Sequence, residues 1–566
     1  MKIRTKRYIL ITAISLIFFL STIILGLLKY STNDDTIMNL IAAGAFGESS
    51  QYLIYNSIII GYILKFLYIA IPGVNWYLWM YLCFNLMAVI ALSVVFSDGR
   101  SLFTTAAITT AINGILAYDF YSEIQFTQNA SLYAVVGCII IFSLLYKGKK
   151  SVFGIVAGTV FTTMAVMVRL TAAGLAIPFL FTALLFTGMF SKEKIKKTFL
   201  YFVTPLVVSI VCIGINFAAY YMNPDWKYFM EWNNIMVEKC DHGNYNFNWD
   251  KEAYLEAGFT ENDFILLDQW VWNDTEYFNL DKLKTMKAIG EGSRQDRLRF
   301  DKDIFAYSFK KLAESPTYSA IPVLFVLMTV LSLILLKKRY RFLALAQSVW
   351  VYALYYVLVC SKRIMWRVEC GIWLSAFFFT LFVIATCTSY KELKLYSFYD
   401  KFKRCFFVAF LAASIAFCII YIRGQYVYFR DEKGGKITQG TDLTYDKVKA
   451  ITEREGFYIV DVDTTYGDMN GAKNIFDIDR KYLDYYENFC QIGGWVQPSP
   501  IGLYHARLND IDNPMRALVD REDVFYIGGG ERAGYVYVFL NEKYGPGINM
   551  EMVDEVCGAP VWRFFR

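Results

Sequence analysis

Long runs of hydrophobic residues recur along most of this 566-residue chain, separated by short polar or basic stretches. A membrane-spanning helix needs roughly 20 apolar residues, and only a helix satisfies the backbone hydrogen bonds inside such a run. The pattern predicts a polytopic α-helical membrane protein. About eleven spans are expected, near residues 8–28, 77–96, 101–117, 130–146, 151–168, 172–190, 199–221, 317–336, 342–360, 370–389 and 404–423.

One further apolar run, 55–71, is short and carries Lys65 in its middle. If it crossed the membrane, the later basic clusters would change sides. We therefore expect it to lie along the outer membrane interface or to re-enter, beside an amphipathic segment at 36–46.

Basic clusters between the runs set the expected orientation, because cytoplasmic loops carry the excess of Lys and Arg. Such clusters lie at 1–7, 147–150, 191–197, 337–341 and 391–404. The N-terminal run resembles a signal peptide, but its apolar core is too long and no cleavage motif follows, so we interpret it as a retained span. A cytoplasmic N-terminus then leaves four segments outside the membrane, namely 31–76, 118–130, 222–316 and 424–566.

The final 140 or so residues have the composition of a soluble domain. Alternating patterns predict strands at 457–463, 523–529 and 534–540, and helical patterns cover 445–455 and 480–489. We therefore expect a transmembrane module at 1–423 and a small extracytoplasmic α/β domain at 424–566. The glycine run at 526–534 lacks both a nucleotide-binding spacing and a following helix pattern, so we assign it no role. Cys490 and Cys557 share this domain, and their spacing leaves a disulfide open.

Composition narrows the class of protein further. The chain is 56% hydrophobic and 19% charged, with a mean hydropathy of +0.35, which excludes an ordinary soluble protein. A net charge of +5 gives no indication of nucleic-acid binding. Two histidines and scattered cysteines make a zinc site improbable.

Acidic residues gather on the first two outer segments. Asn33, Asp34 and Asp35 follow the first span, where a carboxylate can act as a general base or bind a divalent metal. The alternative is a polar stop in which Asp35 or Thr36 caps the next helix. Asp119 and Glu123 are four residues apart, so they would share one helical face, or else belong to a solvated loop.

Isolated cations mark two other positions. Arg169 lies alone between two apolar runs, where it could bind a phosphate or anchor a helix end. Lys362, Arg363 and Arg367 fall on the predicted outer side, with Glu369 nearby. An anionic lipid phosphate would balance them, and so would a salt-bridge cluster. The aromatic, acidic segment 222–316 suits either a sugar-binding surface or a loop folded over the membrane face.

In layout, these features resemble the GT-C superfamily of membrane glycosyltransferases, which includes aminoarabinose transferases, protein O-mannosyltransferases and oligosaccharyltransferases. The resemblance rests on the pair Asp34 and Asp35 in the first outer loop, seven spans before a long outer loop, and a soluble domain that closes the chain. It also extends to uncharacterised Gram-positive membrane proteins of this plan. The WWDYG-like motif of oligosaccharyltransferases is absent from the sequence, and Asp-Asp stands where O-mannosyltransferases have Asp-Glu.

The resemblance implies transfer of a sugar from a polyprenyl-phosphate carrier to an acceptor on the outer face of a bacterial plasma membrane. The acceptor would be a surface glycopolymer, a lipid or a protein. Asp34 or Asp35 would activate the acceptor hydroxyl or bind a metal such as Mg²⁺ or Mn²⁺, with Asp34 preferred, and Glu123 would be the second carboxylate. Arg169, Lys362, Arg363 and Arg367 would bind phosphate, and Asn33 and Asp119 would lie in the substrate site.

Three other readings compete. A transporter would also have many spans, but its charges would lie at mid-membrane and its sequence would show repeats. A polysaccharide polymerase or ligase would use similar lipid-linked substrates without the early acidic pair. A membrane protein whose tail binds wall polymers would need no catalytic group.

Overall fold

The computed structural model describes residues 3–25, 28–292, 301–335, 338–387, 449–462 and 487–566. The predicted span at 404–423 lies outside these residues. The predicted helices at 445–455 and 480–489 are only partly within them.

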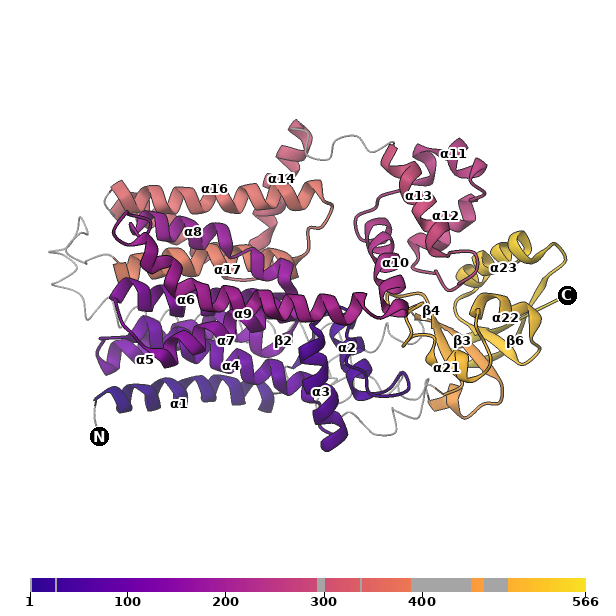
Figure 1. The fold of residues 1–566 in the computed structure, drawn as a ribbon, viewed down its shortest axis with the longest axis horizontal. Helices are drawn as coiled ribbons and strands as arrows, with labels where there is room; N and C mark the ends of the chain where they lie inside the picture. The colour runs from indigo at the N-terminus through magenta and orange to yellow at the C-terminus, as the bar shows by residue number, and fades with distance from the viewer. Residues whose placement is uncertain (1–2, 26–27, 293–300, 336–337, 388–448, 463–486) are drawn as a thin grey trace.

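A bundle of roughly parallel helices forms the N-terminal two thirds of the described chain (Figure 1). Ten of the eleven predicted spans fall on its helices, and seven helices there are long and apolar enough to cross a membrane. The protein is therefore a multi-pass helical membrane protein. The bundle helices are α1 (Ile3–Ile24), α4 (Trp76–Ser97), α5 (Leu102–Ala117), α6 (Phe126–Lys147), α7 (Val152–Gly174), α8 (Ile177–Phe186), α9 (Ile195–Tyr221), α15 (Ile321–Leu335), α16 (Lys338–Cys360) and α17 (Trp366–Phe382).

Small residues set the packing of the inner helices. A side chain at Gly137 of α6 would come within 2.8 Å of the Gly158 backbone of α7, so the two helices approach each other through their glycines. Helices α6 and α17 are largely buried, whereas α1 and α9 expose apolar side chains such as Ile9 and Phe199. Exposed apolar rows of this kind suit contact with lipid tails.

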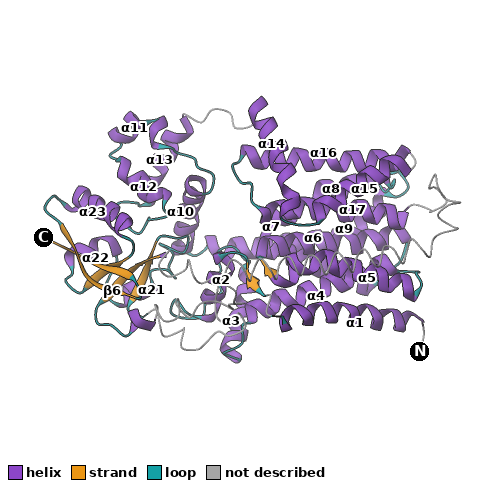
Figure 2. Ribbon diagram, turned by 180° about the vertical axis from the view of Figure 1, so that it is seen from behind, coloured by secondary structure: helices purple, strands orange, loops and turns teal. Residues whose placement is uncertain are grey.

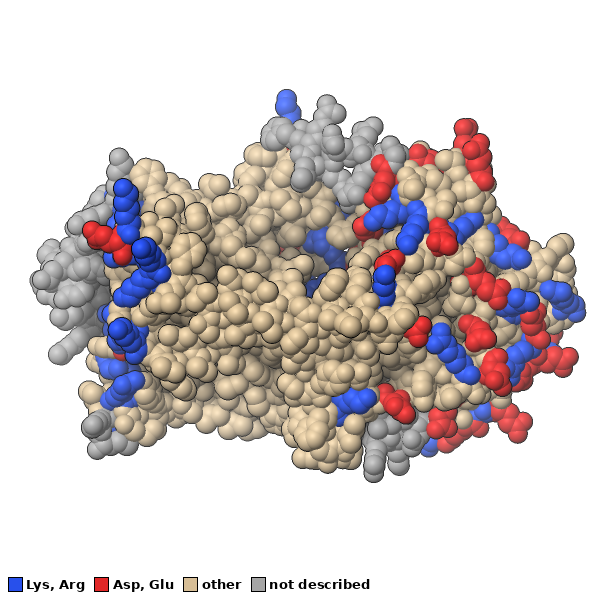
Figure 3. All heavy atoms as spheres, viewed as in Figure 1, with Lys and Arg blue, Asp and Glu red and all other residues tan. Residues whose placement is uncertain are grey.

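Charged side chains gather at the two ends of the molecule and leave an uncharged band between them (Figure 3). One end carries mostly Lys and Arg (Figure 3). The basic clusters 147–150 and 192–197 lie at the end of α6 and around the start of α9. The other end mixes both signs. This distribution agrees with the predicted positive cytoplasmic side; which end faces the cytoplasm remains a prediction.

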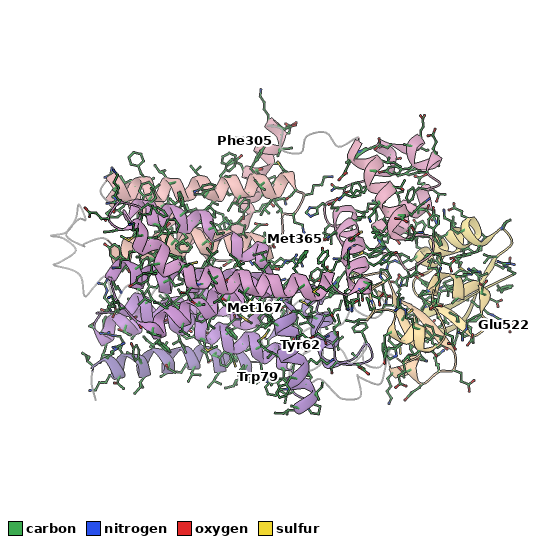
Figure 4. The ribbon with its side chains drawn as sticks, viewed as in Figure 1. Tyr62, Trp79, Met167, Phe305, Met365 and Glu522 are labelled. Atoms are coloured by element: carbon green, nitrogen blue, oxygen red, sulfur yellow. The ribbon has the colours of Figure 1, made fainter. Side chains whose placement is uncertain are left out.

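Two helices of the first outer segment lie at the mixed-charge end of the bundle. Helix α3 (Ile58–Ala70) is too short to span and runs across the axes of α1 and α4, in agreement with an interfacial helix (Figure 1). Tyr62 of α3 and Trp79 of α4 lie together at this edge (Figure 4). Helix α2 (Asn33–Ala43) is buried from Asp35 to Ala43. The prediction of an amphipathic segment at the membrane interface was therefore wrong for these residues. It packs against α3, α4 and the short strand β1 (Lys29–Tyr30) instead.

The long outer segment folds into helices α10 (Pro224–Cys240), α11 (Lys251–Glu256), α12 (Glu261–Asp268) and α13 (Leu280–Gly292), followed by α14 (Lys302–Glu314). Most of its rings are buried among these helices, as at Trp232, Trp272 and Tyr254. These buried rings form the core of the unit, so they face neither a sugar nor lipid, whereas Trp270 of the same segment is only half-buried.

The C-terminal part contains a five-stranded sheet of order β4-β3-β5-β7-β6 (Figure 2). Its strands are β3 (Phe457–Asp461), β4 (Phe489–Ile492), β5 (Val524–Ile527), β6 (Asn549–Val556) and β7 (Ala559–Phe565). Strands β3, β4 and β5 are parallel. The first parallel strand therefore lies between the other two, which makes its carboxyl end a topological switch point. Short helices α21 (Tyr504–Leu508) and α22 (Pro514–Asp520) flank the sheet.

Two predictions for this part were wrong. Residues 534–540 belong to helix α23 (Gly530–Tyr544), in which Ala533, Val536, Phe539 and Leu540 form one buried face. Their helical spacing outweighed the Val and Tyr content, which had favoured a strand. A helix therefore does follow the glycine run after β5. Cys490 and Cys557 are both free thiols, the first buried and the second exposed.

Candidate functional site

A cavity of about 750 Å³ lies between the mixed-charge end of the bundle and the C-terminal part. Figure 3 shows a hollow in this region with basic side chains inside it. Met167 of α7 and Met365, just before α17, lie near this level of the molecule (Figure 4). The lining comes from α2, α7, the segment around α16 and α17, the ends of α10 and α12, and the loops after β3 and β4. Residues from the whole length of the chain therefore meet at one site.

Asp34 lies in the first turn of α2 and lines the cavity together with Asn33. Its Oδ1 accepts a hydrogen bond of 2.9 Å from Trp495 Nε1, and its Oδ2 lies 3.5 Å from Arg367 Nη1. Burial raises the pKa of Asp34, while Arg367, Trp495 and Arg169 oppose that rise. The result is a carboxylate held at the edge of a cavity beside cations.

Asp35 points away from the cavity and is fully buried. Its Oδ1 accepts hydrogen bonds from Tyr77 Oη at 2.8 Å and from the Phe126 backbone N–H at 3.1 Å, and Thr32 donates to Oδ2 at 3.2 Å. Burial raises the pKa of Asp35 to about 8. It joins α2 to α4 and α6 and does not cap α2 with its side chain. The two adjacent aspartates thus lie in different surroundings.

The sequence analysis offered a shared helical face for Asp119 and Glu123, but the structure places them on different elements. Asp119 lies in a π-helical turn (Tyr118–Ser122) that continues α5, where Ser319 donates to its Oδ2 at 2.8 Å. Burial raises its pKa to about 7. Glu123 belongs to strand β2 (Glu123–Ile124), which pairs with β1 (Lys29–Tyr30).

Glu123 forms an ion pair with Lys29 at 2.7 Å and accepts a hydrogen bond of 2.6 Å from Tyr118. Neither Glu123 nor Asp119 lines the 750 Å³ cavity. Their contacts join the turn after α5 to Ser319, which precedes α15, and to Lys29 of β1.

Arg169 lies where α7 departs from helical geometry, with φ −159° and ψ 100°. The carbonyl of Met167 accepts a hydrogen bond of 2.7 Å from the Ser57 backbone N–H, so the interrupted helix finds a partner outside itself. The Arg169 guanidinium lies over the rings of Tyr55 and Phe126, 5.1 and 5.5 Å from their centroids. Within the described part of the chain it has no carboxylate at ion-pair distance, and it faces the cavity.

The basic cluster after α16 divides between two roles. Arg363 and Arg367 line the cavity, and Arg363 Nη2 lies 2.6 Å from Asp241 Oδ2. Lys362 does not line it: its Nζ donates to the Gly243 carbonyl at 3.3 Å and lies over the Trp249 ring. Two of the three predicted cations therefore reach the site.

Several cavity residues escaped the sequence analysis, namely Tyr55, Asp241, His242, Trp270, Trp495 and Arg532. His242 Nδ1 lies 2.8 Å from the Ser361 carbonyl oxygen, which can only accept, so the neutral ring carries its proton on Nδ1 and leaves Nε2 as an acceptor. Arg532 forms an ion pair with Asp461 at 2.6 Å at the carboxyl end of β3. In the sequence, the position of Asp461 at the end of a predicted strand was the local feature that could have indicated a site at the carboxyl end of β3.

The carboxylates of the cavity are already paired with cations. Asp34 faces Arg367, Asp241 faces Arg363, and Asp268 pairs with Lys239. Among the described residues, no group of three or more His, Cys, Asp or Glu is placed to hold a metal ion. The donor set therefore does not fit Mg²⁺ or Mn²⁺, which bind through several free oxygen ligands.

A second, smaller pocket of about 240 Å³ adjoins the first on the side of the bundle. Tyr55, Arg169 and Thr171 line both pockets. The remaining walls are largely apolar residues of α7 and α9 and include Leu170 and Ile213, which are exposed on the outside of the bundle. The smaller pocket also contains the polar residues Asn56, Ser57 and Asn216, and Arg169 is shared by the two pockets.

No family model matches the sequence, and no curated protein matches it significantly. Two solved structures of ArnT from Cupriavidus metallidurans resemble the fold. The one bound to undecaprenyl phosphate shows 11% identity and a TM-score of 0.38, with 98% of this chain and 97% of that chain covered. The apo structure shows 9% identity and a TM-score of 0.39, with 97% of each chain covered.

Proposed function

We propose that this protein is a membrane glycosyltransferase that moves a sugar from a polyprenyl-phosphate donor to a hydroxyl of an extracytoplasmic glycopolymer, lipid or protein. The observation that carries the proposal is the cavity in which one carboxylate, Asp34, faces Arg169 and Arg367 at one end of an apolar bundle. A base and a phosphate-binding cation in one site are the two groups that such a transfer requires.

The reaction is a single displacement at the anomeric carbon. Asp34 takes the proton of the acceptor hydroxyl, the acceptor oxygen bonds to the anomeric carbon, and the bond from that carbon to the phosphate oxygen breaks. The polyprenyl phosphate leaves with the bonding electrons, and the arginines stabilise its added negative charge. The anomeric centre is inverted.

The two adjoining pockets suit the two parts of the donor. The smaller pocket, between α7, α9 and the 54–57 segment, suits the first units of a polyprenyl chain on its α7 and α9 walls, where Leu170 and Ile213 are exposed on the outside of the bundle and offer a path from the membrane. Arg169, shared by both pockets, would then meet the phosphate, while the sugar reaches the polar cavity. Trp270, Trp495 and Tyr55 supply flat rings for the sugar and the acceptor.

The deciding experiment offers purified protein radiolabelled polyprenyl-phosphate sugars together with crude wall or membrane acceptors. We expect label transfer that Asp34→Asn abolishes and Asp35→Asn retains wherever the variant folds. A transporter would bind the labelled lipid without forming product. Transfer that survives Asp34→Asn would remove the proposed base.

Orientation is tested separately. A reporter fused after Arg566 should read extracytoplasmic, and one fused within the 147–150 loop should read cytoplasmic. The opposite pattern would place the site on the wrong face of the membrane for this reaction.

A further inference from the structure

A side chain of the C-terminal part, Trp495, reaches the proposed base. Trp495 lies 461 positions from Asp34 in the sequence, and its Nε1–H donates to Asp34 Oδ1 at 2.9 Å. Trp495 is only 5% exposed, and its ring is 4.6 Å from that of Tyr55, which in turn lies under Arg169. The contact therefore links the carboxylate to the phosphate-binding side of the cavity.

The turn between strand β4 and Trp495 fixes the position of the Trp495 side chain. Strand β4 ends at Ile492, and Gly493 and Gly494 follow with φ of +85° and +80°, a conformation that glycine adopts without strain. The buried side chain of Asn273 clamps this turn. It donates to the Gln491 carbonyl at 2.7 Å and accepts from the Gly493 N–H at 3.0 Å.

Asn273 belongs to the long outer segment, which is itself fixed to the C-terminal part. Lys543 pairs with Asp263 at 3.0 Å, and Asn513 donates to Asp274 at 2.9 Å. The outer segment and the sheet therefore hold the Trp495 turn from both sides, and α2 supplies only the acceptor.

We propose that Trp495 is a positioning residue for Asp34, so that the C-terminal domain completes the active site of the membrane module. The indole N–H fixes Oδ1 and favours the ionised form, so Oδ2, the oxygen that faces Arg367, takes the acceptor proton. The proposal rests on the function above in taking Asp34 as the base.

Other charged groups also face Asp34 and bear on its protonation. They are Arg367 from α17, Arg169 from α7, Asp241 after α10, Asp35 on its own helix and Tyr55 from the loop before α3. Of these groups, Tyr55 contacts Trp495, and Trp495→Phe keeps an aromatic ring against it. A change in Asp34 titration in such a variant therefore reports the lost indole bond.

The test follows Asp34 without any substrate, so its outcome is independent of the transfer assay. Dicyclohexylcarbodiimide reacts with protonated carboxyl groups, and mass spectrometry of the labelled peptides gives the pH midpoint of labelling at Asp34 in the full-length protein. We expect Trp495→Phe, which keeps a ring but lacks the N–H, to raise that midpoint by about one pH unit or more.

Trp562→Phe is the matched control, because Trp562 donates a similar bond to the Gly528 carbonyl elsewhere in the same domain. It should leave the Asp34 midpoint unchanged. Asn273→Ala should raise the midpoint, because it releases the Trp495 turn. Asp119 is buried, so an increase in its labelling reports unfolding of the variant. If Trp495→Phe increases the labelling of Asp119, the Asp34 midpoint measured in Asn273→Ala is used to test the proposal instead. An unchanged Asp34 midpoint in a folded variant overturns the proposal.

The same variants separate the two ideas in the transfer assay. Trp495→Phe should move the acid limb of kcat upward in pH by the same shift, with the donor KM little changed. A shifted labelling midpoint without any detectable transfer would leave the Trp495 contact standing and count against the glycosyltransferase function alone.

Discussion

Arg367 Nη1 lies 3.5 Å from Asp34 Oδ2, across the cavity between the start of α17 and the start of α2. The guanidinium is close enough to favour the ionised carboxylate and is itself on the cavity wall, where a phosphate would lie. The proposed base and the proposed leaving-group site are therefore electrostatically coupled. Four consequences can be measured.

The first concerns pH. Burial raises the pKa of Asp34 and Arg367 opposes that rise, so the ionised, active form is lost as pH falls through the pKa. Arg367→Ala leaves burial less opposed and should shift the acid limb of the transfer rate to higher pH. A pH–rate profile of kcat shows the shift, and an unmoved acid limb would show that Asp34 does not titrate in the rate-limiting step.

The second concerns the phosphate site. Arg169 has no carboxylate partner among the described residues and faces both pockets. Arg169→Ala should raise the donor KM by about 10- to 100-fold, the effect of losing charge-assisted hydrogen bonds. Arg169→Lys should recover only part of it, because lysine lacks the planar fork. Lys362→Ala, outside the cavity, should leave the donor KM unchanged, and an equal effect from both variants would contradict the assignment.

The third concerns Asp35. Its pKa of about 8 lies above the unfolded value, so the folded state favours the protonated form. The contribution of Asp35 to the free energy of unfolding is then largest at low pH and is lost as pH rises toward and through 8, by at most about 1.4 kcal/mol per pH unit. Asp35→Asn cannot ionise and should flatten the dependence of the melting temperature between pH 5 and pH 9. Parallel melting curves for both proteins would disprove this.

The fourth concerns metal. The carboxylates of the cavity are paired with Arg or Lys, and no three-ligand group is present among the described residues. Transfer should therefore continue in excess EDTA at the untreated rate. Loss of activity that Mg²⁺ or Mn²⁺ restores would show that the ion pairs rearrange around a metal when substrate binds.

The hydrophobic pattern of the sequence determined the membrane module. Apolar runs and basic clusters predicted ten spans that the structure places on helices, and Lys65 in a short run predicted the transverse helix α3. These features are local: the length of an apolar run and the charges beside it decide whether it can cross a bilayer. The same reasoning identified Asp34, Arg169, Arg363 and Arg367, which line one cavity.

Only the tertiary structure separated Asp34 from Asp35, because adjacent residues on a helix point in directions about 100° apart and only packing shows which direction meets the cavity. It also placed Lys362, Asp119 and Glu123 outside the cavity and brought in Trp495, Asp241 and Arg532. The roles of Arg532 and Trp495 depend on contacts with residues 71 and 461 positions away, respectively. Such contacts cannot be predicted from the residues next to each side chain in the sequence. In the folded chain, the hydrogen bonds of Asn273 hold the turn that places Trp495 beside Asp34.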